Sequence, residues 1–194
     1  FPTMARARDE DGGEARLVAF KAVEQGYPLR GKLRLVGATG GEEIARGIPA
    51  PGEAWVDPSL LDALGLSVGQ SLLLGEQAFR LTRLIAQEPD RGAGFMSFSP
   101  RVMLNQADVA ATGLVQPASR LNYRLAVAGP EPQVQRFIRW AQAEIERSQV
   151  RGTRLESLDS GRPEMRQTLD RAGKFLSLVA PLAALPSSVA VALV

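Results

Sequence analysis

The pattern of apolar residues near the start of the chain favours strands over 16–23, RLVAFKAV, and 32–36, KLRLV. The loop between them contains Gly26, Pro28 and Gly31, the residue types that turns favour. The pattern predicts two strands near the start of the chain.

A short helix and a hairpin are predicted in the middle of the chain. Asp57 can cap a helix whose first position is Pro58 and which ends at Gly65. Residues 71–74 and 78–86 then flank a three-residue loop, which is a spacing typical of β-hairpins.

A strand–helix–strand unit is predicted further along, after a short strand over 101–104 and a helical turn that ends at Gly113. Apolar positions alternate over 121–127, a helix begins at 130–132, and a last strand covers 153–158. Together these form a split β-α-β unit. The helix has an apolar stripe made of Val134, Phe137, Ile138, Ala141 and Ile145.

The chain ends in an uncharged run over residues 175–194, reached by a helix that begins at Pro163. About 20 apolar residues in a helix cross a bilayer core, so the run is a candidate transmembrane segment. Pro181 and Pro186 favour the alternative of a buried terminal helix, because proline costs about 3 kcal/mol inside a soluble helix. We favour the membrane segment because the run is apolar all round. The opening residues 1–4 read as the interior of an extended chain, so we expect a piece of a longer protein.

The order of elements predicts an α+β fold with two interleaved lobes. In this arrangement residues 14–36 pair with 121–158 in one α/β lobe, and a β-rich lobe is inserted between them. The expected parts are 1–45 with 118–160, then 46–117 as the inserted lobe, then 161–194 as a helix leading into a truncated membrane segment.

Composition excludes several kinds of chemistry. The chain has no cysteine and no histidine, which removes disulfides, Cys/His zinc sites, thiol nucleophiles and imidazole bases. There are 23 basic and 21 acidic residues, for a net charge of +2. Because the arginines are scattered among acidic residues, we expect no nucleic-acid partner.

One glycine-rich stretch resembles a nucleotide-binding motif. Residues 37–41, GATGG, follow a strand like a dinucleotide-binding turn, but Glu43 stands where the third glycine belongs, so a simple turn is the better interpretation. No Walker lysine is present, which argues against nucleotide hydrolysis.

Acidic pairs are the remaining candidates for catalysis, and they lie in polar stretches without apolar neighbours that could raise a pKa. We expect Trp55 and Trp140 to pack in the core or between lobes. No catalytic, cofactor-binding or metal-binding residue is predicted. The acidic groups considered are Asp9-Glu10-Asp11, Glu42-Glu43 and Glu144 with Glu146.

Three segments, 20–35, 55–75 and 98–125, resemble the first periplasmic domain of YbbP-type ABC-transporter permeases, within the wider FtsX/MacB-like permease group. The most specific parts are the GYPLRG loop at residues 26–31 and the passage from Val56 to Gly69, in which a small helix is followed by LG and VG. The resemblance covers nearly all of residues 1–180.

The resemblance implies a MacB-like periplasmic core, with a mixed α/β porter-like lobe and a small β-rich lobe, held at the bacterial inner membrane by flanking helices. It also implies a cytoplasmic ABC ATPase partner, export or extraction of hydrophobic or lipid-like compounds, and an association with a periplasmic esterase of the TesA type. The helix from Pro163 would transmit motion between the membrane helix and the lobes.

Two other classes of function stay open beside transport. One is a binding or scaffold module that is anchored in the membrane and recruits an envelope esterase without transporting anything. The other is a carboxylate-dependent enzyme, which the lack of histidine and of a clustered acidic pair disfavours.

Overall fold

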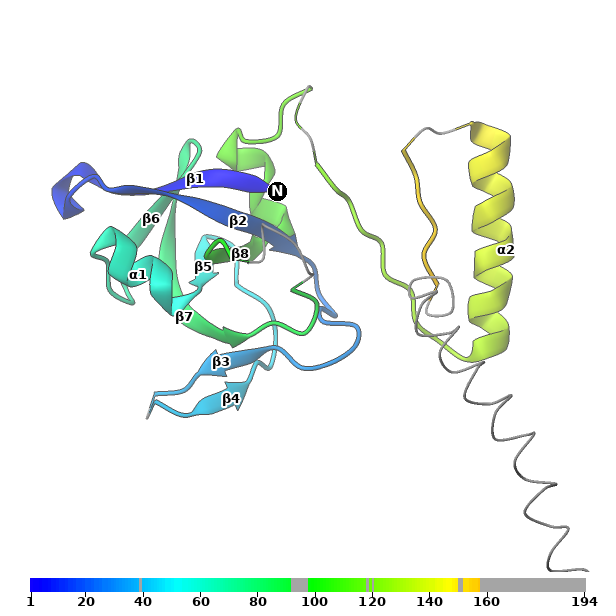
Figure 1. The fold of residues 1–194 in the computed structure, drawn as a ribbon, viewed down its shortest axis with the longest axis horizontal. Coiled ribbons are helices and arrows are strands. Elements are labelled where there is room, and N and C mark those ends of the chain that lie inside the picture. The colour runs from blue at the N-terminus through cyan, green and yellow to red at the C-terminus, as the bar shows by residue number, and fades with distance from the viewer. Residues whose placement is uncertain (39, 92–97, 118, 120, 150–151, 158–194) are drawn as a thin grey trace, which may run out of the picture. The chain divides into compact units, whose positions relative to one another are not determined.

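The strands lie in the first two thirds of the chain, and a long helix follows them (Figure 1). The computed structural model describes residues 1–38, 40–91, 98–117, 119, 121–149 and 152–157, and the chain divides into two units, Phe1–Val127 and Ala128–Val194. The strands are β1 (Pro2–Ala7), β2 (Ala15–Val23), β3 (Arg34–Val36), β4 (Glu42–Ile44), β5 (Glu53–Val56), β6 (Ser71–Leu74), β7 (Gln77–Gln87) and β8 (Arg101–Asn105). The helices are α1 (Pro58–Leu64) and α2 (Glu131–Ser148), with 3₁₀ turns η1 (Asp9–Asp11), η3 (Gln106–Asp108) and η4 (Ala110–Thr112). Helices and strands therefore combine in an α+β fold.

Strands of the first unit close into a barrel. Their order is β7-β5-β8-β2-β1-β6, and β6 pairs back onto β7 to complete the ring. The β2–β8 and β5–β7 pairs are parallel, whereas β1–β2, β1–β6, β5–β8 and β6–β7 are antiparallel. Closure gives each of these strands a partner on both sides, so none of them offers an open edge for pairing.

Side-chain alternation fills the barrel. On β8, Val102 and Leu104 belong to the inner cluster, while Met103 between them points to the opposite face. The inner cluster consists of Ala5, Ala7, Val18, Phe20, Ala54, Val56, Leu60, Leu64, Leu66, Leu72, Leu74, Phe79, Leu81, Val102 and Leu104. A second, outer cluster consists of Val23, Leu33, Leu35, Trp55, Ile85 and Met103. Strand β8 is thus buried on both faces, because residues of β3 and the end of β7 cover its outer face.

The β3–β4 hairpin confirms that residues 37–41 form a turn. Strand β3 pairs antiparallel with β4, Gly37 N–H donates to the Gly41 carbonyl over 2.6 Å, and Gly40 N–H donates to the Gly37 carbonyl over 3.0 Å. Because a strand follows instead of a helix, no helix N-terminus is available here for a pyrophosphate.

Helix α1 follows the prediction except at its cap. It begins at Pro58 and ends at Gly65, whose φ of 63° is the left-handed conformation that glycine adopts readily. The Asp57 side chain, however, makes no capping hydrogen bond. Asp57 is thus the N-cap residue, as expected, but its carboxylate accepts from the Arg91 side chain and the Arg101 backbone N–H instead of from the helix.

The hairpin and the strand pairing differ from the predictions in detail. The turn between β6 and β7 has two residues, Gly75 and Glu76, instead of three, and β7 continues to Gln87. Strands β1, β4 and β5 were not anticipated. Strand β2 pairs with β1 and β8, so the expected pairing of residues 14–36 with 121–158 was wrong. The grouping of residues 1–45 with 118–160 in one lobe stays a prediction.

The predicted helix at 130–132 is confirmed as α2, but its predicted flanking strands are not. Residues 121–127 and 153–157 form no strand, and Tyr123 and Leu125 are 77% and 85% exposed. Alternation of apolar and polar residues shows which side chains could share a face. A strand also needs a second strand with which its backbone can pair, and the described residues supply none for these two segments.

The predicted helix from Pro163 and the apolar run over 175–194 lie outside the described residues. Within the part of the chain that the structure describes, no helix has the length and apolar character needed to cross a bilayer.

Candidate functional site

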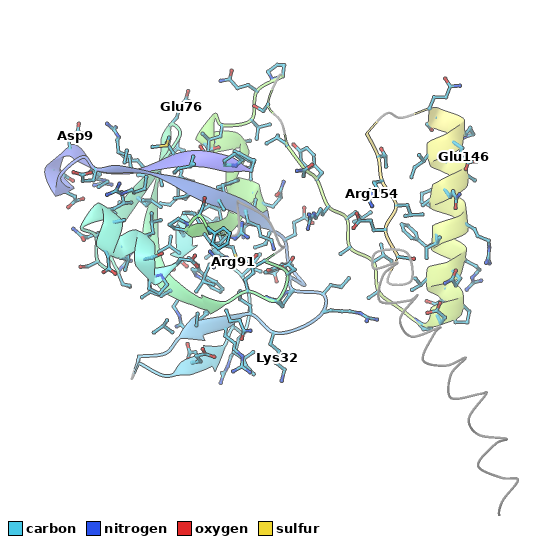
Figure 2. All side chains as sticks on the ribbon, viewed as in Figure 1. Asp9, Lys32, Glu76, Arg91, Glu146 and Arg154 are labelled. Atoms are coloured by element: carbon cyan, nitrogen blue, oxygen red, sulfur yellow. The ribbon has the colours of Figure 1, made fainter. Side chains whose placement is uncertain are left out.

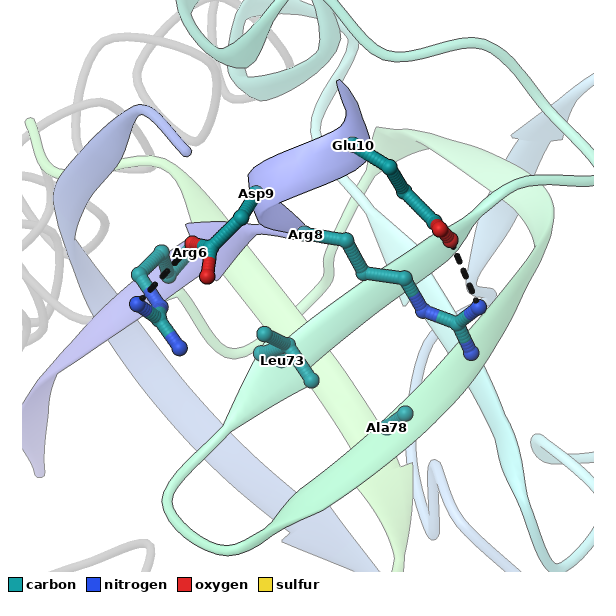
Figure 3. A pocket seen from close by; sticks show the side chains of 6 residues that line it. All are labelled: Arg6, Arg8, Asp9, Glu10, Leu73 and Ala78. Carbon is teal, nitrogen blue, oxygen red and sulfur yellow. Dashed lines mark hydrogen bonds and ion pairs between the residues drawn. The ribbon is translucent and has the colours of Figure 1, made fainter. Parts of the chain in front are cut away.

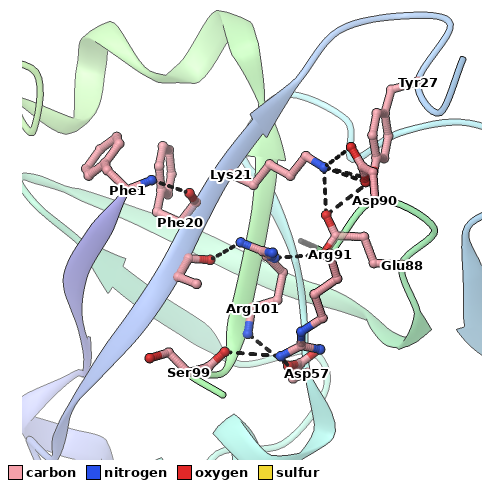
Figure 4. A network of polar contacts seen from close by, with 11 residues as sticks. Phe1, Phe20, Lys21, Tyr27, Asp57, Glu88, Asp90, Arg91, Ser99 and Arg101 are labelled. Atoms are coloured by element: carbon pink, nitrogen blue, oxygen red, sulfur yellow. Dashed lines mark hydrogen bonds and ion pairs between the residues drawn. The ribbon is translucent and has the colours of Figure 1, made fainter. Parts of the chain in front are cut away.

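A buried carboxylate, Glu88, connects two strands of the barrel (Figure 4). Its side chain is fully buried, and it accepts from Lys21 Nζ through Oε1 and from Arg101 Nε through Oε2, both over 2.7 Å. Arg101 is paired with Ala19 on the parallel strands β2 and β8, and Lys21 lies two residues beyond Ala19 on the same face. Lys21 and Arg101 therefore bind the two oxygens of the Glu88 carboxylate.

Lys21 also reaches a tyrosine–aspartate pair. Its Nζ donates to both carboxylate oxygens of Asp90 over 2.8 Å and to the Tyr27 hydroxyl over 3.0 Å, and it lies 4.3 Å from the Tyr27 ring centroid. The Tyr27 hydroxyl donates to Asp90 Oδ1 over 2.6 Å. These contacts tie the loop after β2 to the loop after β7.

The same contacts shift two pKa values in opposite directions. Burial, the hydrogen bond to Asp90 and the nearby negative charges of Glu88 and Asp90 raise the pKa of Tyr27 well above its ordinary value. Burial alone would raise the pKa of Asp90, but hydrogen bonds from Lys21 and Tyr27 outweigh it and lower that pKa. The pair is therefore a neutral phenol donating to a carboxylate.

A second buried carboxylate, Asp57, accepts from Arg91 and from the backbone of Arg101. Its Oδ2 accepts from Arg91 Nη2 over 2.6 Å and from the Arg101 backbone N–H over 2.9 Å, and Arg91 also donates to the Ser99 carbonyl over 3.1 Å. Asp57 thus fixes the start of α1 against the start of β8. We name Lys21, Tyr27, Asp57, Glu88, Asp90, Arg91 and Arg101 the polar network.

The loop that contains GYPLRG packs directly on the chain after β7. Gly31 has a φ of +79°, and a Cβ placed there would lie 2.6 Å from Pro89 Cβ. Tyr27 of the same loop binds Asp90, the residue after Pro89. The most specific part of the resemblance therefore has a structural role, since it fastens two loops together.

The polar network offers little for catalysis. Each of its carboxylates already faces a lysine or an arginine, so none is placed as a free base. Among the described residues, no three or more acidic side chains gather as a metal site would require. The prediction that the chain has no catalytic residue stays a prediction.

None of the acidic groups from the sequence analysis belongs to the polar network. Most of them pair with a neighbouring arginine: Asp9 with Arg6, Glu10 with Arg8, Glu42 with Arg34, Glu43 with Arg83 and Glu144 with Arg147. Trp55 is buried in the outer cluster, as expected, and its Nε1 finds no hydrogen-bond partner among the residues that the structure describes. Trp140 is 61% exposed and contacts the Phe137 ring, with 5.7 Å between ring centroids.

The surface has shallow hollows, of which two are described here. The first, of about 390 Å³, lies on the barrel and is lined by Arg6, Arg8, Asp9, Glu10, Leu73 and Ala78 (Figure 3). Its charged side chains already pair with one another, which leaves little to recognise a ligand. The second hollow, of about 420 Å³, lies between α2 and residues 152–157 and is lined by Ile138, Gln142, Ile145, Glu146, Thr153, Leu155 and Ser157.

Sequence reasoning missed the polar network and the second hollow. A signal for the network existed, because Glu88 directly follows a strand with a buried face and Arg101 begins the next strand. The sequence signal for the second hollow was weaker. The apolar stripe of α2 indicated that this face of the helix packs against something, but it did not identify the segment that packs there.

Comparison with known proteins gives one clear relative. No protein-family model matches the chain. The chain is 31% identical over 192 residues to the uncharacterized ABC transporter permease YbbP of Escherichia coli (strain K12), a match that covers 99% of this chain and 22% of the relative. The chain thus spans about a fifth of the length of that relative. Over nearly its whole length the chain is therefore similar to one domain-sized part of this ABC transporter permease.

Proposed function

We propose that the chain is a non-catalytic periplasmic domain of an ABC-transporter permease. In this proposal it couples ATP hydrolysis by a cytoplasmic ABC ATPase to the export or extraction of hydrophobic or lipid-like compounds. The observation that carries the proposal is the likeness to a permease over 99% of the chain.

The first unit supports a mechanical role. A closed barrel has no unpaired strand edge at which it can open, and the polar network adds ion pairs that join strands β2 and β8 to Glu88 after β7. A body of this kind moves as a unit when attached helices move, which is how a distant ATPase can act on it.

The location in the periplasm can be tested with a single cysteine. The chain has none of its own, and Val68 is 51% exposed in the barrel unit. In the intact permease, Val68→Cys should react with a membrane-impermeant maleimide once the outer membrane is permeabilised and before the inner membrane is opened. The parent permease is the control for other cysteines. Labelling only after inner-membrane lysis would place the domain in the cytoplasm and refute the proposal.

Coupling can be tested in proteoliposomes that contain the intact permease and its ATPase. A permease without the region of this chain should still assemble with the ATPase, but it should lose export of a fluorescent hydrophobic compound. Unchanged export would contradict the coupling role. Co-purification from membranes reports the partners, and an esterase found without any transport activity would favour the scaffold alternative.

A further inference from the structure

The outer face of the β3–β4 hairpin carries mostly basic side chains. Leu33 and Leu35 pack in the outer cluster, so Lys32 and Arg34, which alternate with them, lie on the opposite, exposed face. Ile44 is paired with Arg34 across the two strands and therefore shares this face. Figure 2 shows Lys32 at the start of the hairpin.

The pairing of the hairpin continues one residue beyond the strands. The Ala45 N–H donates to the Leu33 carbonyl over 2.9 Å, and Ala45 packs against the outer cluster. Arg46, which follows Ala45, therefore alternates to the exposed face and comes opposite Lys32. We name the exposed face, together with two exposed residues of the loop before β3, the hairpin surface; it consists of Leu29, Arg30, Lys32, Arg34, Glu42, Ile44 and Arg46.

The hairpin surface is positively charged. It has four basic residues and one acidic residue, Glu42, which gives a net charge of +3, whereas the net charge of the whole chain is +2. Glu42 accepts from Arg34 Nη1 over 3.3 Å. The next acidic residue, Glu43, alternates to the other face of β4 and pairs with Arg83 of β7. The positive charge is thus concentrated on one face of the hairpin.

Two large apolar side chains are exposed within this positive charge. Leu29 is 47% exposed and Ile44 is 50% exposed. Exposed apolar side chains among lysine and arginine are typical of surfaces that lie on anionic membranes, because the apolar groups enter the head-group region and the cations bind the negative head groups. None of the seven residues lines either of the two hollows. A surface without a pocket suits a deformable lipid layer better than a protein partner, whose anchoring side chains fill pockets.

We propose that the hairpin surface binds anionic phospholipids at the surface of a bilayer, with Leu29 and Ile44 at the level of the head groups. The inference rests on the proposed function for one point, which is that the intact permease holds this domain near a membrane. A tethered domain meets the bilayer at a high effective concentration, so even a weak contact is occupied.

A fluorescent probe can report this contact directly. The chain has no cysteine, so a polarity-sensitive NBD fluorophore can be attached to Leu29→Cys in the hairpin surface, or to Val68→Cys, an equally exposed position elsewhere in the barrel unit. Each labelled 194-residue chain is mixed with vesicles of phosphatidylcholine alone or of an equal mixture with phosphatidylglycerol. We expect a blue shift at position 29 with the anionic vesicles alone, quenching of this probe by doxyl groups on the lipid chains, and no change at position 68.

Two pairs of substitutions test the role of the charge, with binding measured by the probe at position 29. Lys32→Gln combined with Arg46→Gln should weaken binding to the anionic vesicles about 25-fold, because each cation near an anionic surface contributes about fivefold. Arg80→Gln combined with Arg124→Gln removes the same charge from exposed positions outside the hairpin surface, and it should weaken binding by less than about threefold.

Several outcomes would overturn the proposal. Equal losses for the two pairs of substitutions would show that only the total charge matters. A probe at position 29 that responds equally to neutral vesicles, or probes at 29 and 68 that respond alike, would indicate binding through another part of the chain, such as the uncharged run over 175–194. Binding to soluble polyglutamate as tight as to the anionic vesicles would favour an acidic protein surface instead.

The outcome can be separated from that of the proposed function. If the intact permease exports no hydrophobic compound while the probe at position 29 responds as expected, the transport role is wrong and the lipid contact stands. If export is observed and the probe does not respond, the lipid contact alone is wrong.

Discussion

Glu88 shows how one buried side chain determines the arrangement of a loop region. With its side chain fully buried, it needs both Lys21 and Arg101 to offset the loss of hydration. Each of these cations also binds elsewhere, Lys21 to Asp90 and Arg101 through its backbone to Asp57. A change at Glu88 therefore affects the whole polar network.

Glu88→Gln should destabilise the barrel by about 2–4 kcal/mol, because removing one partner of a buried ion pair leaves the others uncompensated. The measurement is the midpoint of urea unfolding. Glu10→Gln is the control, since the Arg8–Glu10 pair is exposed and should contribute no more than about 0.5 kcal/mol. Equal shifts of the midpoint for the two variants would show that the buried ion pairs of Glu88 stabilise the barrel no more than an exposed pair does.

Tyr27 gives a prediction at alkaline pH. Its pKa is raised in the folded chain above the value of about 10 that an unfolded tyrosine has, so the fold favours the neutral phenol. This contribution to stability is complete below about pH 10 and is lost as the pH rises above the unfolded value. The absorbance at 295 nm, taken as the difference between the parent chain and Tyr27→Phe, should rise only together with unfolding seen by circular dichroism. Ionisation of Tyr27 near pH 10 in a chain that is still folded would contradict the role of the hydrogen bond to Asp90.

At the scale of elements, the loop between β2 and β3 depends on a glycine for two reasons. The φ of +79° at Gly31 disfavours any other residue, and the missing Cβ leaves room for Pro89. Gly26, in the same loop, shares the first property, with a φ of +91°, but a Cβ there would meet nothing within 4 Å.

This difference makes a matched pair of variants. Gly26→Ala should cost about 1 kcal/mol for the backbone conformation alone. Gly31→Ala should cost a further 1–3 kcal/mol or so, since the new methyl group overlaps Pro89 and displaces one of the two loops. Urea unfolding of both variants measures the difference. Equal costs would mean that the two loops separate freely, and the proposed fastening by Gly31 would be wrong.

The elements that the sequence predicted well carry their signals locally. Helix α1 has Pro58 at its start and Gly65 at its end, and α2 has a continuous apolar stripe. Strand β5 was missed because it is buried on both faces and shows no alternation, which is the pattern of a strand covered on each side. The strands predicted over 121–127 and 153–158 failed for a different reason, since alternation reports a face to be covered and does not identify the partner.

The site was harder to predict than the fold, because its members are far apart in the sequence. Lys21 and Glu88 are 67 positions apart, and Asp57 and Arg101 are 44 positions apart. Only the closure of the barrel brings them together. Asp57 is the clearest case, since its position before Pro58 is typical of a helix cap, while in the fold its carboxylate binds Arg91 and Arg101.

For the whole molecule, the two units differ in how much core they have. All buried hydrophobic residues of the described chain lie between Ala5 and Leu104, whereas α2 has no buried residue. A unit with its own hydrophobic core can fold alone, but an amphipathic helix that has none depends on cover from elsewhere. The barrel should therefore be the part that determines the stability of the chain.

A chain shortened to residues 1–127 should fold and unfold with a free energy within about 1 kcal/mol of that of the 194-residue chain, because the inner and outer clusters remain complete. Fluorescence of the buried Trp55 reports the transition in both chains, once Trp140→Phe removes the second tryptophan from the longer one. A loss of more than about 3 kcal/mol, or a shortened chain without a cooperative transition, would show that residues 128–194 support the barrel. Equal stability instead means that residues 128–194, the apolar face of α2 included, do not hold the barrel together.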